Sequence, residues 1–129
     1  MTYPLSRIMS TATATYGGYA LAQPRHLGRA VTSNPIKQAD LDVLAQTFGA
    51  RDLAISSLGA FGRSEKTVTA AMLLRIALDV SDGVILSVRA DSDEARAKVL
   101  AVTFGWATLN AVALMVDRRR ARKGRLVVV

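Results

Sequence analysis

The sequence has no cysteine, and His26 is its only histidine. The absence of cysteine excludes disulfide bonds, cysteine-based zinc sites and cysteine nucleophiles. A single histidine also argues against a histidine-based metal site and against a Ser-His-Asp triad. We therefore expect no bound metal ion and no cofactor.

The chain has the size of one domain and is too apolar to be disordered. It contains 129 residues, of which 50% are hydrophobic, and its mean hydropathy is +0.24. Domains usually contain about 100–200 residues. A chain of this composition can bury enough apolar surface to fold, so intrinsic disorder is excluded.

The formal charge of +7 is concentrated near the C-terminus, in the basic segment formed by residues 118–129. All but one of the net positive charges are supplied by Arg118, Arg119, Arg120, Arg122, Lys123 and Arg125. A basic cluster directly after an apolar segment is typical of a cytoplasmic anchor that contacts anionic lipid head groups. A nucleic-acid-binding tail is the alternative, but no aromatic residue interrupts the cluster to stack on bases. We prefer the anchor and expect no nucleic-acid partner.

Four apolar segments are separated by polar residues and contain no proline: residues 8–23, 41–62, 67–88 and 99–116. As helices they would be roughly 24 to 33 Å long, and the hydrocarbon core of a bilayer is about 30 Å thick. The fourth segment has no charged residue. The sequence therefore predicts an all-α fold, a four-helix transmembrane bundle in residues 1–117 followed by the basic segment.

The distribution of basic residues between the connecting loops predicts the orientation. Basic residues are more numerous on the side that holds both termini, so we expect a multi-pass cell-membrane protein with cytoplasmic termini. A soluble four-helix bundle is an alternative, against which the uncharged fourth segment argues. A cleaved secretory signal ending near Ala20-Leu21-Ala22 is another, but the preceding segment is too rich in threonine and glycine.

Charged residues lie in the middle of the second and third segments, where each costs about 2.5–3.5 kcal/mol at the bilayer centre. Arg51 and Asp52 are adjacent, whereas Arg75, Asp79 and Asp82 are spaced i, i+4, i+7 and share one helix face. An antiparallel hairpin with a short loop brings Asp52 level with Arg75 and predicts an ion pair between them. Arg51 points about 100° away and is expected to reach a different neighbour.

These five groups comprise two cations and three anions, which leaves at least one carboxyl without a basic partner. We expect one of Asp79 and Asp82 to be protonated or to contact a ligand at neutral pH. The alternative is that the cluster only locks the helices together. A cavity opening onto Asp52, Arg75 and Asp79 would favour a ligand-binding or enzymatic role.

Other polar and aromatic side chains could line the same interior: Tyr16, Tyr19, Thr103, Trp106 and Asn110. We expect Asn110 to form a hydrogen bond to a neighbouring helix. The candidate ligand contacts are Tyr16, Tyr19, Trp106, Arg51 and, as the alternative to its bond between helices, Asn110. His26 falls in a polar loop and is expected to be solvated.

The motif Gly49-Ala50-Arg51-Asp52-Leu53, the acidic third helix and Leu21-Ala22-Gln23-Pro24 at the end of the first resemble one protein family. This family comprises small bacterial and fungal four-helix membrane proteins grouped as a domain of unknown function. The resemblance covers residues 8–116 and implies a four-helix integral membrane protein. It implies no established activity, and the basic segment is not part of the pattern.

Three functions remain open at this point. The first is an accessory or structural membrane protein, as a homo-oligomer or in a larger complex. The second is a membrane-embedded enzyme for a lipid or isoprenoid-like substrate, with Asp52, Asp79 or Asp82 as acid or base and Arg51 or Arg75 orienting the substrate. The third is a proton or ion pathway, which would require oligomerisation.

Overall fold

The computed structural model describes the backbone of residues 2–128 and the side chains of residues 2–125. These residues form five helices and no strand: α1 (Pro4–Ala22), α2 (Arg25–Val31), α3 (Pro35–Phe61), α4 (Glu65–Arg89) and α5 (Asp93–Val128). The all-α prediction is confirmed. Each of the four apolar segments corresponds to one long helix. Helices α4 and α5 extend beyond the predicted bounds at both ends, whereas α1 and α3 begin earlier and end one residue before the predicted bound.

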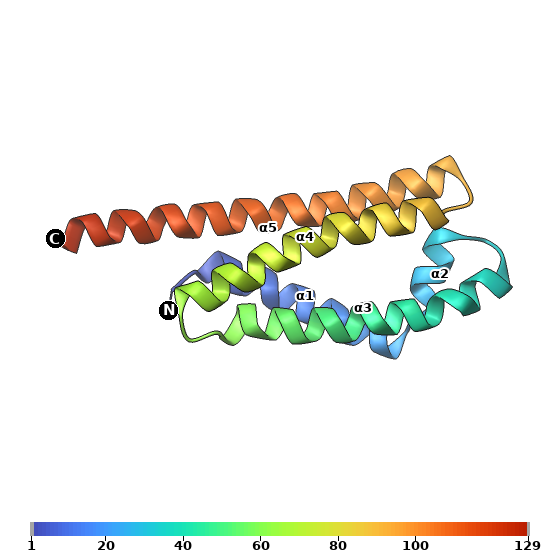
Figure 1. Ribbon diagram of the computed structural model, residues 1–129, viewed down its shortest axis with the longest axis horizontal. Helices are drawn as coiled ribbons and strands as arrows, with labels where there is room; N and C mark the ends of the chain where they lie inside the picture. Colours follow the sequence, from blue (N-terminus) through green and yellow to red (C-terminus); the bar gives the residue numbers. More distant parts are fainter. Residues whose placement is uncertain (1, 129) are drawn as a thin grey trace.

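The four long helices run alternately along the molecule, so α1 begins and α5 ends at the same end (Figure 1). Helix α1 packs mainly on α3, and α4 packs mainly on α5. Contacts of α3 with α4 and of α1 with α5 close the bundle. The short helix α2 lies near the opposite end, against α3.

Helix α2 corrects the expectation that a polar loop joins the first two long helices. Leu27, Gly28 and Val31 are buried in it. Gly28 allows a close approach, since a Cβ there would lie 2.7 Å from the Cα of Gln38 on α3. Helix α3 then begins at Pro35, because the side chain of Asn34 accepts a hydrogen bond from the backbone N–H of Ile36 at 2.9 Å.

Helices α1 and α3 approach closely at two glycines. A Cβ on Gly17 would lie 2.8 Å from the backbone oxygen of Gly49, and a Cβ on Gly49 would lie 2.7 Å from that of Gly17. Any larger residue at either position would push the helices apart. Small residues at such crossings are typical of helix packing in lipid.

Helix α5 continues without interruption through the basic segment to Val128. Arginine and lysine favour helix, and no proline is present to end it. The basic segment is therefore the C-terminal part of α5, which extends beyond the other helices (Figure 1).

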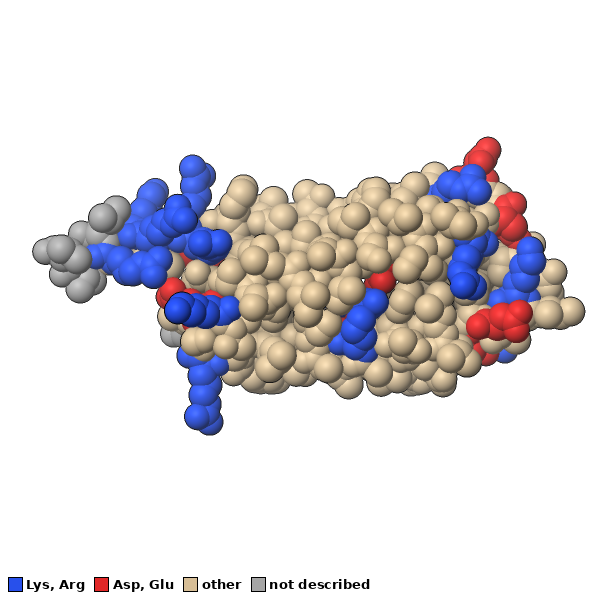
Figure 2. Space-filling view, in the orientation of Figure 1, with Lys and Arg blue, Asp and Glu red and all other residues tan. Residues whose placement is uncertain are grey.

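The face of the molecule shown in Figure 2 is uncharged in the middle and charged at both ends. Basic side chains gather at the end where α5 terminates, and basic and acidic side chains mix at the other end. The uncharged middle of this face is interrupted by charged atoms at only one place. Large apolar side chains face outward on all four long helices, among them Ile8, Leu58, Leu73, Leu109 and Met115, each more than half exposed.

Among the described helices, α5 alone is long and apolar enough to cross a membrane by length and composition, in the range Asp93–Arg125. Helices α3 and α4 are long enough to cross a membrane, but each contains charged residues in its middle. Helix α1 is rich in threonine and glycine, which lowers its hydropathy.

Candidate functional site

All five charged residues predicted for the interior form one ionic network between α3 and α4. Helix α3 supplies Arg51 and Asp52, and α4 supplies Arg75, Asp79 and Asp82. The three residues on α4 are all buried, as their i, i+4, i+7 spacing predicted. Two guanidinium and three carboxylate groups give the network a net formal charge of −1.

Arg75 is the centre of this network, and its side chain is only 3% exposed. Its Nη1 donates a hydrogen bond to Asp52 on the neighbouring helix, which confirms the contact predicted from the hairpin geometry. Its Nη2 lies 2.9 Å from Oδ1 of Asp79 and 3.6 Å from Oδ2 of Asp82. One guanidinium therefore contacts all three carboxylates.

Arg51 joins the network from its edge, where its side chain is 22% exposed. It donates two hydrogen bonds to Asp82, from Nη1 at 3.0 Å and from Nη2 at 2.5 Å. Its Nη2 also lies 3.0 Å from Oδ1 of Asp52, and its guanidinium carbon lies 4.6 Å from the centre of the Phe48 ring. Arg51 thus reaches a different main partner from Arg75, as predicted.

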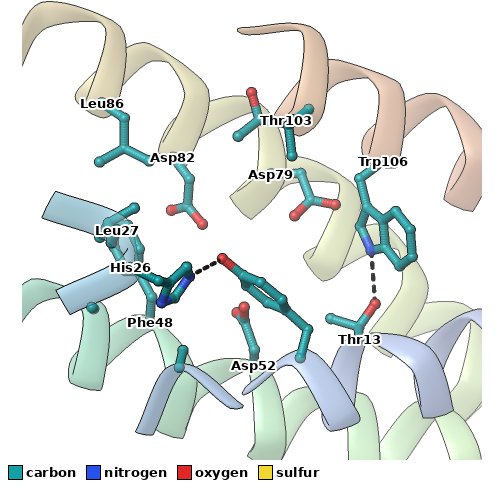
Figure 3. Close-up of a pocket in the computed structure, with 14 residues that line it drawn as sticks. Thr13, His26, Leu27, Phe48, Asp52, Asp79, Asp82, Leu86, Thr103 and Trp106 are labelled. Atoms are coloured by element: carbon teal, nitrogen blue, oxygen red, sulfur yellow. Dashed lines mark hydrogen bonds between the residues drawn. The ribbon is translucent and has the colours of Figure 1, made fainter. Parts of the chain in front are cut away.

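A cavity of about 260 Å³ lies beside the network and is lined by residues of all five helices. The carboxylates of Asp52, Asp79 and Asp82 point from α3 and α4 into this space (Figure 3). Its walls are otherwise mostly apolar or aromatic: Thr13, Tyr16, Ala20, His26, Leu27, Ala45, Phe48, Leu86, Val102, Thr103 and Trp106. The ionic network is therefore not fully enclosed by packed side chains, because an open cavity adjoins its three carboxylates.

The carboxylate of Asp79 is only partly satisfied. The residue is 8% exposed, and its Oδ1 pairs with Arg75. Its Oδ2 is buried and has no hydrogen-bond partner among the side chains and backbone groups that the structure describes. An unpaired buried oxygen is costly unless another group satisfies it.

His26 lies on α2 and not in a polar loop, and it lines the cavity while its side chain stays partly exposed. Its Nδ1 lies 2.7 Å from the carbonyl oxygen of Gln23, and its Nε2 lies 2.6 Å from the hydroxyl of Tyr16. Because a carbonyl only accepts, Nδ1 carries a proton and donates it there. Nε2 of a neutral ring then accepts from Tyr16, a contact drawn as a dashed line in Figure 3.

Tyr16 and Trp106 line the cavity, as expected, whereas Tyr19 packs beside His26 with its ring centre 5.0 Å away. Tyr19 is 51% exposed and is not among the described residues that line the cavity. The indole nitrogen of Trp106 donates to Oγ1 of Thr13 at 2.8 Å and so connects α5 to α1.

Asn110 is fully buried, but its amide nitrogen donates to the carbonyl of Trp106 on the same helix at 2.9 Å. The predicted hydrogen bond to another helix is absent among the described residues, and the amide oxygen has no partner there. Asn110 lies one turn beyond Trp106 and does not reach the described cavity wall.

Sequence reasoning missed part of the cavity wall, including Thr13 and Phe48. Phe48 had a usable signal, because it lies four residues before Asp52 and so shares its helix face. Among the described side chains, no group of three histidine, cysteine, aspartate or glutamate residues is placed to hold a metal ion.

Comparisons of the chain with models of known families, with curated proteins and with solved structures find no match.

Proposed function

We propose that the protein is a multi-pass membrane protein whose four long helices span the bilayer and whose interior cavity binds a small molecule. The observation that carries this proposal is the reversed distribution of polarity in the bundle. Arg75 and its three carboxylate partners are buried, whereas large apolar side chains are exposed on every long helix. In water this arrangement would expose a large apolar area, and in lipid it is the favourable one.

The charges at the two ends of the bundle support one orientation of the bundle in the membrane. The end that carries the basic segment is the one attracted to the anionic cytoplasmic leaflet. Helix α1 begins and helix α5 ends at this end of the bundle (Figure 1). We therefore place both termini in the cytoplasm of a cell membrane, with the basic segment on lipid head groups.

The cavity supports a binding role over a catalytic one. The enzyme hypothesis needs Arg51 or Arg75 to orient a substrate, but carboxylates already hold both guanidinium groups. Neither arginine is among the described residues that line the cavity. Binding requires only the carboxylates that line the cavity and the apolar wall, and fits an accessory protein that works alone, as an oligomer or in a larger complex.

The absence of cysteine allows a direct test of the membrane topology, because single cysteines can be introduced without interference. Thr2→Cys and Ser33→Cys place an exposed thiol at opposite ends of the bundle, and Leu109→Cys places one in the apolar middle. In intact cells a membrane-impermeant maleimide should label only Ser33→Cys. After lysis it should also label Thr2→Cys, whereas Leu109→Cys should react only when the membrane is dissolved.

Alkaline extraction of membranes provides the second measurement. The protein should remain in the membrane pellet at high pH. Release into the soluble fraction, or labelling of Leu109→Cys in intact membranes, would contradict the proposal.

A further inference from the structure

We propose that the cavity binds a compact organic cation, a protonated amine with an apolar body whose ammonium group contacts Asp79. This inference rests on the proposed function and specifies the ligand class of the same cavity. It follows from the charge of the cavity, from one unsatisfied oxygen and from the chemistry of the wall.

The charge of the cavity favours a cation. Three carboxylates line it, and no lysine or arginine does so among the described residues. Arg51 and Arg75 lie behind the carboxylates and neutralise two of the three negative charges. A ligand with one positive charge would make the site electrically neutral, whereas an anion would increase its excess negative charge.

The unsatisfied oxygen of Asp79 indicates where the positive charge of the ligand would lie. Its carboxylate points into the cavity between Asp82 and Trp106 (Figure 3). Arg75 occupies Oδ1, and Oδ2 has no partner within the described part of the chain. The neighbouring ionisable groups have partners of their own: Asp52 with Arg75, Asp82 with Arg51, and Tyr16 with His26. Arg75 meets Asp79 through a charge contact only, because its Nε and Nη2 form no hydrogen bond within the described part of the chain. An ammonium group, which only donates hydrogen bonds, would satisfy the remaining oxygen.

The wall suits the rest of such a ligand. Tyr16, Phe48 and Trp106 supply aromatic faces, which attract cations and pack on apolar groups. Leu27, Leu86 and other aliphatic side chains complete the wall. The volume of about 260 Å³ suits a compact molecule and is too small for a whole phospholipid.

Three ligands of nearly equal shape and different charge test the proposal: 2-phenylethylamine, 2-phenylethanol and phenylacetate. Trp106 is the only tryptophan of the chain and lines the cavity, so its fluorescence reports occupancy directly. In detergent-purified protein at neutral pH, the amine should cause a saturable change with an affinity at least about tenfold higher than that of the alcohol. Phenylacetate should bind more weakly than the alcohol.

Two matched variants locate the charge. Asp79→Asn keeps the size of the side chain and removes its charge, so it should lower the affinity for the amine at least about tenfold and leave that for the alcohol nearly unchanged. Asp42→Asn makes the same change in a carboxylate that pairs with Arg25 outside the cavity. This control should bind the amine as the wild type does. Far-UV circular dichroism checks that both variants fold.

Each outcome decides the ligand class separately from the membrane proposal. Equal affinity for amine and alcohol, or unchanged amine binding by folded Asp79→Asn, would overturn the cation proposal but leave a neutral-ligand cavity. Absence of saturable binding by all three ligands would overturn both the cation and the cavity as a binding site. If Asp79→Asn does not fold, the comparison of the three ligands on the wild type still decides the question.

Discussion

Replacing Arg75 with methionine tests whether the ionic network holds the bundle together. Methionine has a similar unbranched chain but no charge, so the change removes the guanidinium that contacts Asp52, Asp79 and Asp82. The net charge of the buried cluster falls from −1 to −2, and Asp79 loses its only described cationic partner. Removing one partner of a buried ion pair costs about 3–5 kcal/mol, because the remaining charge is left uncompensated.

The matched control is Arg51→Met, which removes a guanidinium of the same network. The Arg51 side chain is 22% exposed, whereas that of Arg75 is 3% exposed. Arg75 still contacts all three carboxylates after this change, so Arg51→Met should cost less than Arg75→Met. The double variant Arg75→Met/Asp79→Asn should recover part of the loss, because it removes the orphaned charge.

Unfolding by sodium dodecyl sulfate in mixed micelles, followed by far-UV circular dichroism, measures the free energies of unfolding. A loss of less than about 1 kcal/mol for Arg75→Met would refute the reasoning, since that value is typical of exposed ion pairs. So would a double variant that is less stable than Arg75→Met alone.

Two other predictions use the same unfolding measurement. Gly17→Ala should destabilise the protein by about 1–3 kcal/mol, because the new Cβ would meet the backbone oxygen of Gly49 at 2.8 Å. Gly18→Ala is its control and should be neutral or slightly stabilising, since no described atom outside its own helix lies within 4 Å of the Cβ position. Equal losses of stability in the two variants would contradict the proposed role of the contact between Gly17 and Gly49. Asp117→Ala should cost about 0.5–2 kcal/mol, because this buried carboxylate accepts hydrogen bonds from the first N–H groups of α1, and an unchanged stability would show that the cap contributes nothing.

Much of the bundle was predictable because its signals are local. The four long helices follow from apolar segments without proline, and the buried face of α4 follows from the spacing of Arg75, Asp79 and Asp82. The contact of Asp52 with Arg75 required one further assumption, an antiparallel hairpin with a short loop. The structure has this hairpin, with α3 ending at Phe61 and α4 beginning at Glu65.

The remaining features depend on packing between distant segments, which no local pattern encodes. Helix α2 has seven residues, too few for a periodic signal, and its place is set by Leu27 and Val31 packing with side chains of α3 and α4. His26 reaches Tyr16 only because α2 folds back beside α1. The burial of Asp117 depends on the start of α1, more than 100 residues away in sequence.

The excess of acidic groups is what separates a binding site from a structural lock. A cluster that only joined α3 to α4 would be least costly to bury with equal numbers of cations and anions. The observed network has one carboxylate more than its two arginines can neutralise, and the incompletely satisfied residue, Asp79, lines a cavity. The arginines limit the cost of burial to one net charge, and the position of Asp79 presents that charge to the cavity. Departures of this kind from complete charge pairing are expected in natural proteins at functional sites.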